Sequence, residues 1–333
     1  MDYRKFGLFR TREINTGKLF ITPKIDGYGL NDLYPWNFTI PTRPYIDVFK
    51  SLNTTNNFKD ADYALVPHGW RQIKKDKNYL NYLNQLGHEI PVLIFNSGDT
   101  ASTCNLNNSL ELRTHLQPWE NLKRKIVFPY PTSPKQFTER IWKSEPIISF
   151  MGYVPKFGFT SFFGNEIRCL RKPIKSSVYL IRHISTLRLN RLSKNFNVIV
   201  IKRDQFTAYN SNPLLGQHTN EYDELLSESD YVLCPRGLGN SSIRFYETLS
   251  SGATPILIDT NSGLPKVPNE KFWETNILKV GLFSNWRSSI QRDWDYLKHG
   301  DNYSMRQKQN SETFSRNLEV NQFFNELFKN YIN

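Results

Sequence analysis

Short apolar runs alternate with segments of helical period along the first half of the chain. Residues 78–86 carry apolar side chains at helical spacing and stop at Gly87, so they predict an amphipathic helix. Four runs rich in β-branched and aromatic residues predict strands, at 18–22, 62–67, 91–95 and 125–128. Strands that alternate with helices predict a mostly parallel sheet with crossover helices.

The same alternation returns after Pro146. Residues 221–226 and the polar segment that follows Trp286 have helical periodicity. Four further runs predict strands, at 147–151, 197–201, 231–234 and 254–258. The second half therefore repeats the α/β pattern of the first.

The 333 residues exceed what one hydrophobic core usually serves. We expect one α/β domain at 1–145 and a second at 146–290. We expect helices at 291–333, with packing of these helices against the first domain as one alternative. The proline-interrupted stretch between Pro129 and Pro146 is interpreted as the connection between the domains.

Charge and cysteine usage narrow the class of protein. The 43 Lys and Arg outnumber the 31 Asp and Glu, and the net charge of +12 favours anionic partners or, alternatively, serves solubility. Three dispersed cysteines indicate a reducing compartment. No signal peptide or membrane span is evident, so we expect a soluble or cytoplasmic protein; a trimmed Golgi-type anchor would leave no trace in this sequence.

The stretch CPRGLGNSSIRFYE, residues 234–247, carries the main candidate chemistry. It follows a predicted strand, and we expect a helix to begin near Asn240 or Ser241 and to end before Gly252. Glycines in the loop permit close backbone approach, and the helix start offers unpaired N–H groups to a phosphate.

Two arginines in this stretch point to an anion. Arg236 lies in the loop, and Arg244 lies in the first helical turn, where the helix dipole disfavours a positive charge. Glu247 shares a helix face with Arg244, so a surface ion pair is the alternative interpretation. The stretch has no third glycine of a dinucleotide fingerprint, and the chain has no P-loop motif.

These residues resemble the signature of the exostosin family of glycosyltransferases. The resemblance covers residues 221–266, with YVLCPRG, SIRFYE and GATPILI in the family's order and spacing. It implies a GT-B fold: two Rossmann-like domains with mostly parallel sheets that face each other across a cleft. It further implies inverting transfer of a sugar, most readily from a UDP-sugar, to a glycan hydroxyl without a metal or any cofactor beyond the donor.

The resemblance also implies roles for individual residues. Arg236 and Arg244 would neutralise the departing diphosphate, and Glu247 would accept hydrogen bonds from the ribose hydroxyls. The loop and the helix start would complete the donor site through Gly237, Gly239, Asn240, Ser241 and Ser242.

Candidates outside the motif rest on their positions after predicted strands. Asp99 and His68 are the candidates for the base that accepts the proton of the attacking hydroxyl, with Asp99 slightly favoured. Arg182 and Arg203, interpreted as strand-end arginines, would reach the diphosphate. Gly152 would open the loop that admits the donor.

Two other functions remain open from the sequence. One is a GDP-fucose-type GT-B transferase. The other is a binding protein for glycans or nucleic acid that has kept the fold and lost catalysis. No nucleic-acid-binding signature is found, so we expect a nucleotide-sugar donor and a glycan or glycoconjugate acceptor as partners, and no nucleic acid.

Overall fold

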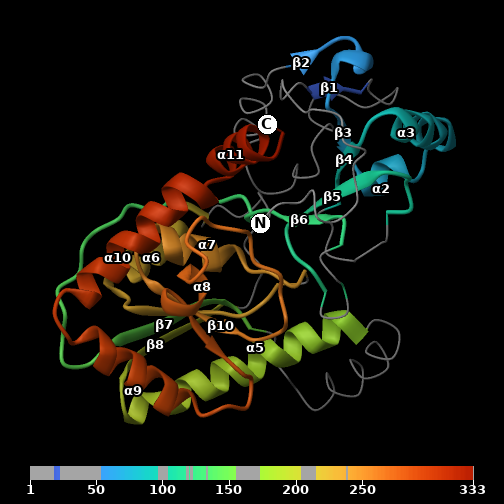
Figure 1. Ribbon diagram of the computed structural model, residues 1–333. Coiled ribbons are helices and arrows are strands. Elements are labelled where there is room, and N and C mark those ends of the chain that lie inside the picture. The colour runs from blue at the N-terminus through green and yellow to red at the C-terminus, as the bar shows by residue number, and fades with distance from the viewer. Residues whose placement is uncertain are drawn as a thin grey trace. The chain divides into compact units, whose positions relative to one another are not determined.

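The computed structural model describes residues 19–22, 54–96, 104–117, 120, 123–132, 134–154, 173–203, 215–237 and 239–332. The chain divides into two compact units (Figure 1). Unit 1 comprises Met1–Pro131, Gly263–Lys266 and Asn317–Asn333, and unit 2 comprises Thr132–Ser262 and Val267–Arg316.

Unit 1 contains a parallel sheet in the order β2-β1-β3-β4-β5-β6. Every strand pair described in it is parallel. The strands are β1 (Leu19–Ile21), β2 (Thr54–Thr55), β3 (Tyr63–Gly69), β4 (Val92–Phe95), β5 (Ser109–Arg113) and β6 (Lys125–Val127).

Apolar layers cover both faces of this sheet. Along β3, Tyr63 and Leu65 pack with α11 (Val320–Ile332), whereas Ala64 and Val66 pack with α2 (Trp70–Ile73) and α3 (Lys77–Glu89). A short 3-10 turn, η3 (Phe58–Asp60), precedes β3. Burial on both faces explains why these strands appear in the sequence as continuous apolar runs.

Helix α3 differs from the sequence prediction at its carboxyl end. The Asp76 side chain caps its start by accepting from the Tyr79 N–H at 2.9 Å. The helix continues through Gly87 to Glu89. Gly87 is not a stop signal: a Cβ there would lie 2.5 Å from the Asn107 carbonyl oxygen, so the glycine permits a loop to approach the helix.

Unit 2 contains a second parallel sheet in the order β11-β10-β9-β7-β8. All strand pairs described in this sheet are parallel. The strands are β7 (Ile147–Tyr153), β8 (Asn197–Arg203), β9 (Tyr231–Cys234), β10 (Thr254–Ile258) and β11 (Leu278–Val280).

Helices cover the two faces of this sheet, and α5 and α7 lie on opposite sides of it in Figure 1. Tyr231 and Leu233 of β9 pack in one apolar cluster with side chains of α5 and α9. The Cys234 Sγ points to the other face and lies 3.5 Å from Thr248 of α7. The helical elements are α5 (Pro173–Arg191), η4 (Leu192–Lys194), α6 (Leu215–Glu228), α7 (Ile243–Ser250), α8 (Phe272–Thr275), α9 (Trp286–Leu297), α10 (Asn302–Thr313) and η5 (Phe314–Leu318).

The predicted α/β class, with two units that each hold a parallel sheet, is confirmed. The chain passes from unit 1 to unit 2 within the stretch interpreted as the connection, after Pro131, and Trp142 of this stretch stacks on Trp294 with ring centroids 5.8 Å apart. Within the described ranges, no helix is both long and apolar enough to cross a membrane.

Candidate anion-binding site

The strand order of unit 2 places a topological switch point between β7 and β9. From β7 the chain reaches β8 on one side and later returns to β9 on the other. In open parallel sheets, ligands bind beyond the carboxyl ends of the strands at such a point. Gly152 and Tyr153 end β7, and Pro235 and Arg236 follow β9, so the motif residues lie at this edge.

The loop after β9 turns tightly before α7 begins. The Gly237 N–H donates to the Ser241 carbonyl at 2.7 Å. Ser242 is the N-cap residue, with extended backbone angles of φ −136° and ψ 126°, so α7 begins one or two residues later than predicted. The Ser242 side chain caps none of the first N–H groups, and within the described part of the chain its buried Oγ has no hydrogen-bond partner.

Two arginines lie buried at this edge, although one is not where the sequence placed it. Arg182 belongs to the middle of α5 rather than to a strand end, which corrects the prediction. Its Nε donates to the Arg236 carbonyl at 3.0 Å, and its Nη1 donates to the Tyr153 carbonyl at 3.2 Å. Arg182 therefore ties together the segments that follow β7 and β9. Arg236 is itself 7% exposed.

The local electrostatics disfavour these positive charges. Burial and the nearby charge of Arg244 lower the pKa of Arg182 to about 9. Burial also lowers the pKa of Arg236. Cations that are desolvated close to one another destabilise the charged state unless an anion offsets them. The edge is thus suited to a strongly anionic group.

Arg244 is held between two elements. Its Nη2 lies where a side chain of Gly152 would be, because a Cβ at Gly152 would come within 2.7 Å of it. On α6, the Tyr222 ring centroid is 5.8 Å from the Arg244 Cζ. Burial raises the pKa of the Tyr222 hydroxyl well above its ordinary value, and the adjacent Glu247 carboxylate raises it further.

Glu247 is engaged by side chains other than Arg244. Its Oε1 accepts a hydrogen bond from the Thr132 Oγ1 at 3.3 Å, and its charge is close enough to the Tyr222 hydroxyl to raise the pKa of that hydroxyl. The surface ion pair that was the alternative interpretation of Arg244 and Glu247 is therefore not formed.

The remaining motif residues either form the loop or anchor it to the rest of unit 2. Both sides of the Asn240 amide bind Thr260: Nδ2 donates to its carbonyl at 2.9 Å, and Oδ1 accepts from its hydroxyl at 2.6 Å. Asn240 thus anchors the loop to the chain after β10. Gly239 is buried, whereas Gly237 and Ser241 are partly exposed.

Arg203 is already paired. It ends β8 as predicted, forms an ion pair with Glu221 and donates toward the Met151 Sδ at 3.6 Å. Its charge is compensated without a ligand, which distinguishes it from Arg182 and Arg244.

The structure describes only one of the two candidate bases. Asp99 lies outside the described residues. His68 lies inside β3, at an irregularity in the pairing with β4, and has no exposed surface. Its ring meets Tyr79 edge-on with centroids 5.8 Å apart. This burial gives an acceptor hydroxyl no access to His68, so the geometry disfavours it as the base.

Sequence reasoning missed several charged and polar groups. Tyr222 and Thr132 are distant in sequence from the arginine and the carboxylate that they contact, so no local signal marks them. Unit 1 also holds a buried ion pair, in which Arg113 lies 3.1 Å from Glu111. Both belong to β5, and the alternation of charged and apolar residues in SLELR is the signal that could have identified this strand.

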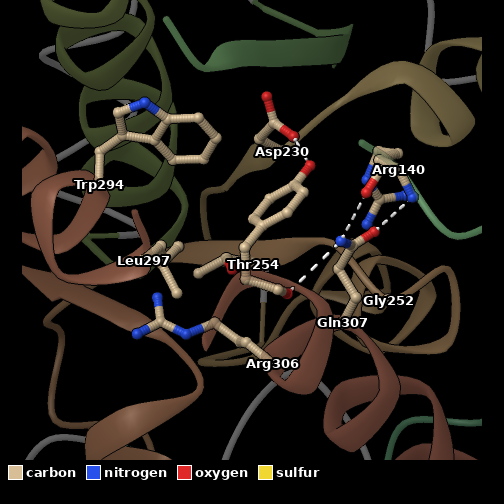
Figure 2. A pocket seen from close by; sticks show the side chains of 9 residues that line it. Arg140, Asp230, Gly252, Thr254, Trp294, Leu297, Arg306 and Gln307 are labelled. Carbon is tan, nitrogen blue, oxygen red and sulfur yellow. Dashed lines mark hydrogen bonds between the residues drawn. The ribbon is translucent and has the colours of Figure 1, made fainter. Parts of the chain in front are cut away.

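A second polar cluster lies at the opposite, amino-terminal edge of the unit 2 sheet (Figure 2). The Asp230 carboxylate accepts hydrogen bonds from the Ile147 N–H at 2.8 Å and from the Tyr303 hydroxyl. The Gln307 amide accepts from the Arg140 N–H at 2.8 Å and donates to the Arg140 carbonyl at 3.0 Å. The cavity among these groups measures about 10 Å³, which is space for one water molecule.

The chain was compared with known protein families and sequences. No protein-family model matches the chain. A stretch of 45 residues is 51% identical to an exostosin-1 homolog of Caenorhabditis elegans, and the match spans 14% of this chain and 12% of that protein.

Three solved structures show distant similarity. An α1,3-fucosyltransferase crystallised with GDP has 13% identity and a TM-score of 0.38, over 94% of this chain and 90% of that chain. AviGT4, a glycosyltransferase involved in avilamycin A biosynthesis, has 10% identity and a TM-score of 0.38, over 95% and 98% of the two chains. MurG of Acinetobacter baumannii has 10% identity and a TM-score of 0.34, over 86% and 76%.

Among the described residues, no group of three His, Cys, Asp or Glu side chains is arranged to hold a metal ion.

Proposed function

We propose that this protein is a GT-B glycosyltransferase that binds a nucleoside-diphosphate sugar at the β7/β9 edge of unit 2. Arg236, Arg244 and Arg182 bind the diphosphate, and Glu247 binds the ribose hydroxyls. The donor is a UDP-sugar, and the acceptor is a glycan hydroxyl. The short exostosin match supports this class of reaction.

The proposed reaction is an inverting transfer. The acceptor oxygen forms a bond to the anomeric carbon as the bond from that carbon to the diphosphate oxygen breaks. The diphosphate leaves with the bonding electron pair, and a base takes the acceptor proton. Asp99 remains the candidate for this base. Negative charge develops on the departing diphosphate, so guanidinium groups fixed beside it stabilise the transition state.

One observation supports the donor site most strongly: Arg182 and Arg244 lie close enough for one charge to lower the pKa of the other. Arg236 is also buried, and its backbone carbonyl accepts a hydrogen bond from the Arg182 Nε. A solvated surface would separate such charges. Their concentration at a topological switch point favours a ligand with more than one negative charge.

Nucleotide binding and turnover test the proposal. UDP, GDP and their sugars are screened by thermal shift, and donor turnover is measured for the wild type and for Arg236→Ala. We expect a uridine nucleotide to stabilise the wild type. The Arg236→Ala variant should lose at least about 100-fold in turnover. Absence of stabilisation by every nucleotide would refute the proposal, and stabilisation by GDP alone would reassign the donor.

Arg316 supplies a matched control. Its side chain is 75% exposed, and its ion pair with Glu312 is the ordinary i,i+4 contact of a helix surface. Arg316→Ala removes the same charge from unit 2 and should leave turnover unchanged. Equal losses in both arginine variants would indicate a general effect of net charge rather than a site.

A protein that binds the donor without transferring the sugar is the second candidate. The observation that favours it is the complete burial of His68, which leaves Asp99 as the sole base candidate from the sequence. Such a protein would bind UDP with the predicted arginine dependence and show no donor turnover in the presence of any acceptor.

A further inference from the structure

Arg244 occupies space that would otherwise belong to another residue's side chain. A Cβ built at Gly152 would lie 2.7 Å from the Arg244 Nη2, 2.9 Å from its Cζ and 3.4 Å from its Nε. These are the three heavy atoms nearest to that Cβ, and all belong to one guanidinium group. Any larger residue at 152 must therefore displace Arg244.

The strand itself does not require a glycine at this position. Gly152 lies within β7, pairs in register with Lys202, and does not have a positive φ. A glycine inside a strand loses packing and backbone entropy, and it commonly marks a point where another group approaches closely. Here the approaching group is the Arg244 guanidinium.

The Tyr222 ring bounds the guanidinium as well. Its centroid lies 5.8 Å from the Arg244 Cζ, within the range of a cation–π contact. The Lys135 ammonium lies at the same distance from this ring and is paired with Asp223 at 2.7 Å. Tyr222 and Asp223 are consecutive on α6, so this helix presents an aromatic and an acidic surface to two cations of unit 2.

Tyr222 also connects the arginine with the proposed ribose-binding carboxylate. Its hydroxyl is buried near Glu247, whose charge adds to burial in raising the pKa of that hydroxyl, and the hydroxyl has no hydrogen-bond partner among the described residues. The Arg244 Nε is likewise buried and lacks a hydrogen-bond partner among the described residues. Packing rather than hydrogen bonding therefore fixes Arg244, and its donor capacity remains available for a ligand.

We propose that Gly152 and Tyr222 form a slot that holds Arg244 in position for the donor diphosphate, and that both are positioning residues for the transfer. This inference rests on the proposed function. The slot pre-orients the guanidinium, so that little conformational freedom is lost when the diphosphate binds.

A double-mutant cycle tests the slot. UDP dissociation constants and melting temperatures are measured for the wild type, Gly152→Ala, Arg244→Ala and the double variant. The new methyl group acts on binding by displacing Arg244. Gly152→Ala should therefore weaken UDP binding by about tenfold in the wild type and cause no further loss in the Arg244→Ala background. The melting temperature of Gly152→Ala should not fall, because alanine is compatible with the strand.

Gly281→Ala is the matched control. A Cβ at Gly281 would make only ordinary contacts, the nearest to the Ser284 Cβ at 3.6 Å. This variant should bind UDP as the wild type does. An equal loss from Gly152→Ala in both backgrounds would overturn the inference, because the methyl group would then act on the ligand or on the strand. No loss in either background would overturn it as well.

Tyr222 variants provide a second, independent readout. Tyr222→Leu removes the aromatic surface and should weaken UDP binding about as much as Gly152→Ala does, again only when Arg244 is present. Tyr222→Phe keeps that surface and should restore most of the affinity. If the wild type binds UDP and these variants match it, only the slot is refuted. If the wild type binds neither UDP nor GDP, the proposed function and the slot are refuted together.

Discussion

The two edges of the unit 2 sheet use polar residues in opposite ways. At the amino-terminal edge, the Asp230 carboxylate and the Gln307 amide are matched by defined donors and acceptors. At the carboxyl-terminal edge, burial and the nearby charge of Arg244 lower the pKa of Arg182, and burial alone lowers the pKa of Arg236. The first arrangement stabilises the fold, whereas the second is the one that the proposed function assigns to an anionic ligand.

The same sheet explains both arrangements. The amino ends of β7, β9 and β10 are crossed by α10 and by the segment that contains Arg140, which bury them. The carboxyl ends of β7 and β9 meet at the switch point, where β8 lies on one side of β7 and β9 on the other. Polar residues at a covered edge must bond to each other, because an unmatched buried group is costly. At the switch point a ligand can complete the bonding.

Loss of Asp230 should give the largest effect on stability. Asp230→Ala leaves the Ile147 N–H and the Tyr303 hydroxyl without their acceptor and the buried Arg140 without its offsetting carboxylate. We expect a loss of about 3–5 kcal/mol in the free energy of unfolding. Urea denaturation measures this loss. UDP affinity of the folded fraction should not change, and a parallel loss of affinity would show that the two edges are not separable.

Arg244→Ala should have the opposite pair of effects: it should weaken UDP binding without lowering the free energy of unfolding. It removes a cation from the first turn of α7 and a like charge near Arg182, while it loses a cation–π contact with Tyr222. These contributions are each about 0.5–1 kcal/mol, so the free energy of unfolding should stay constant or rise by up to about 1 kcal/mol. A decrease of more than about 1 kcal/mol in thermal or urea unfolding would assign Arg244 to the structural framework.

The smallest expected effect is a pH dependence at the amino-terminal edge. Burial raises the pKa of Asp230 in the folded state, so the ionised carboxylate costs stability, and this cost diminishes as the pH falls through the raised pKa. The stability of the wild type relative to Asp230→Asn should therefore increase as the pH is lowered from neutrality. Urea unfolding of both proteins along a pH series measures this change in relative stability. A relative stability that decreased toward acid would mean that the pKa is lowered instead.

The sequence predicted elements whose apolar pattern is unbroken. Both β4 and β9 are continuous apolar runs, and each was located within one residue of its bounds. β5 was missed because its apolar residues alternate with charged ones instead of forming a continuous run, and the ion pair that lets Glu111 and Arg113 be buried is visible only in three dimensions. Arg182 was assigned to a strand because the residues before it, Val178 to Ile181, are all apolar or aromatic, yet they form part of α5.

For the candidate site, the sequence indicated the local motif but not its surroundings. Arg236, Arg244 and Glu247 lie within one short stretch, so their shared location follows from spacing alone. The contacts of Arg244 with Gly152 and Tyr222 join segments that are far apart in the chain. Such contacts depend on strand order, which the sequence pattern does not specify.

The structure of crystals soaked with UDP is the most direct test of the central claim. A nucleotide is expected at the carboxyl ends of β7 and β9. Its diphosphate oxygens should lie within hydrogen-bonding distance of Arg236, Arg244 and the first N–H groups of α7. An ordered UDP bound elsewhere, with these arginines contacting only protein, would contradict it.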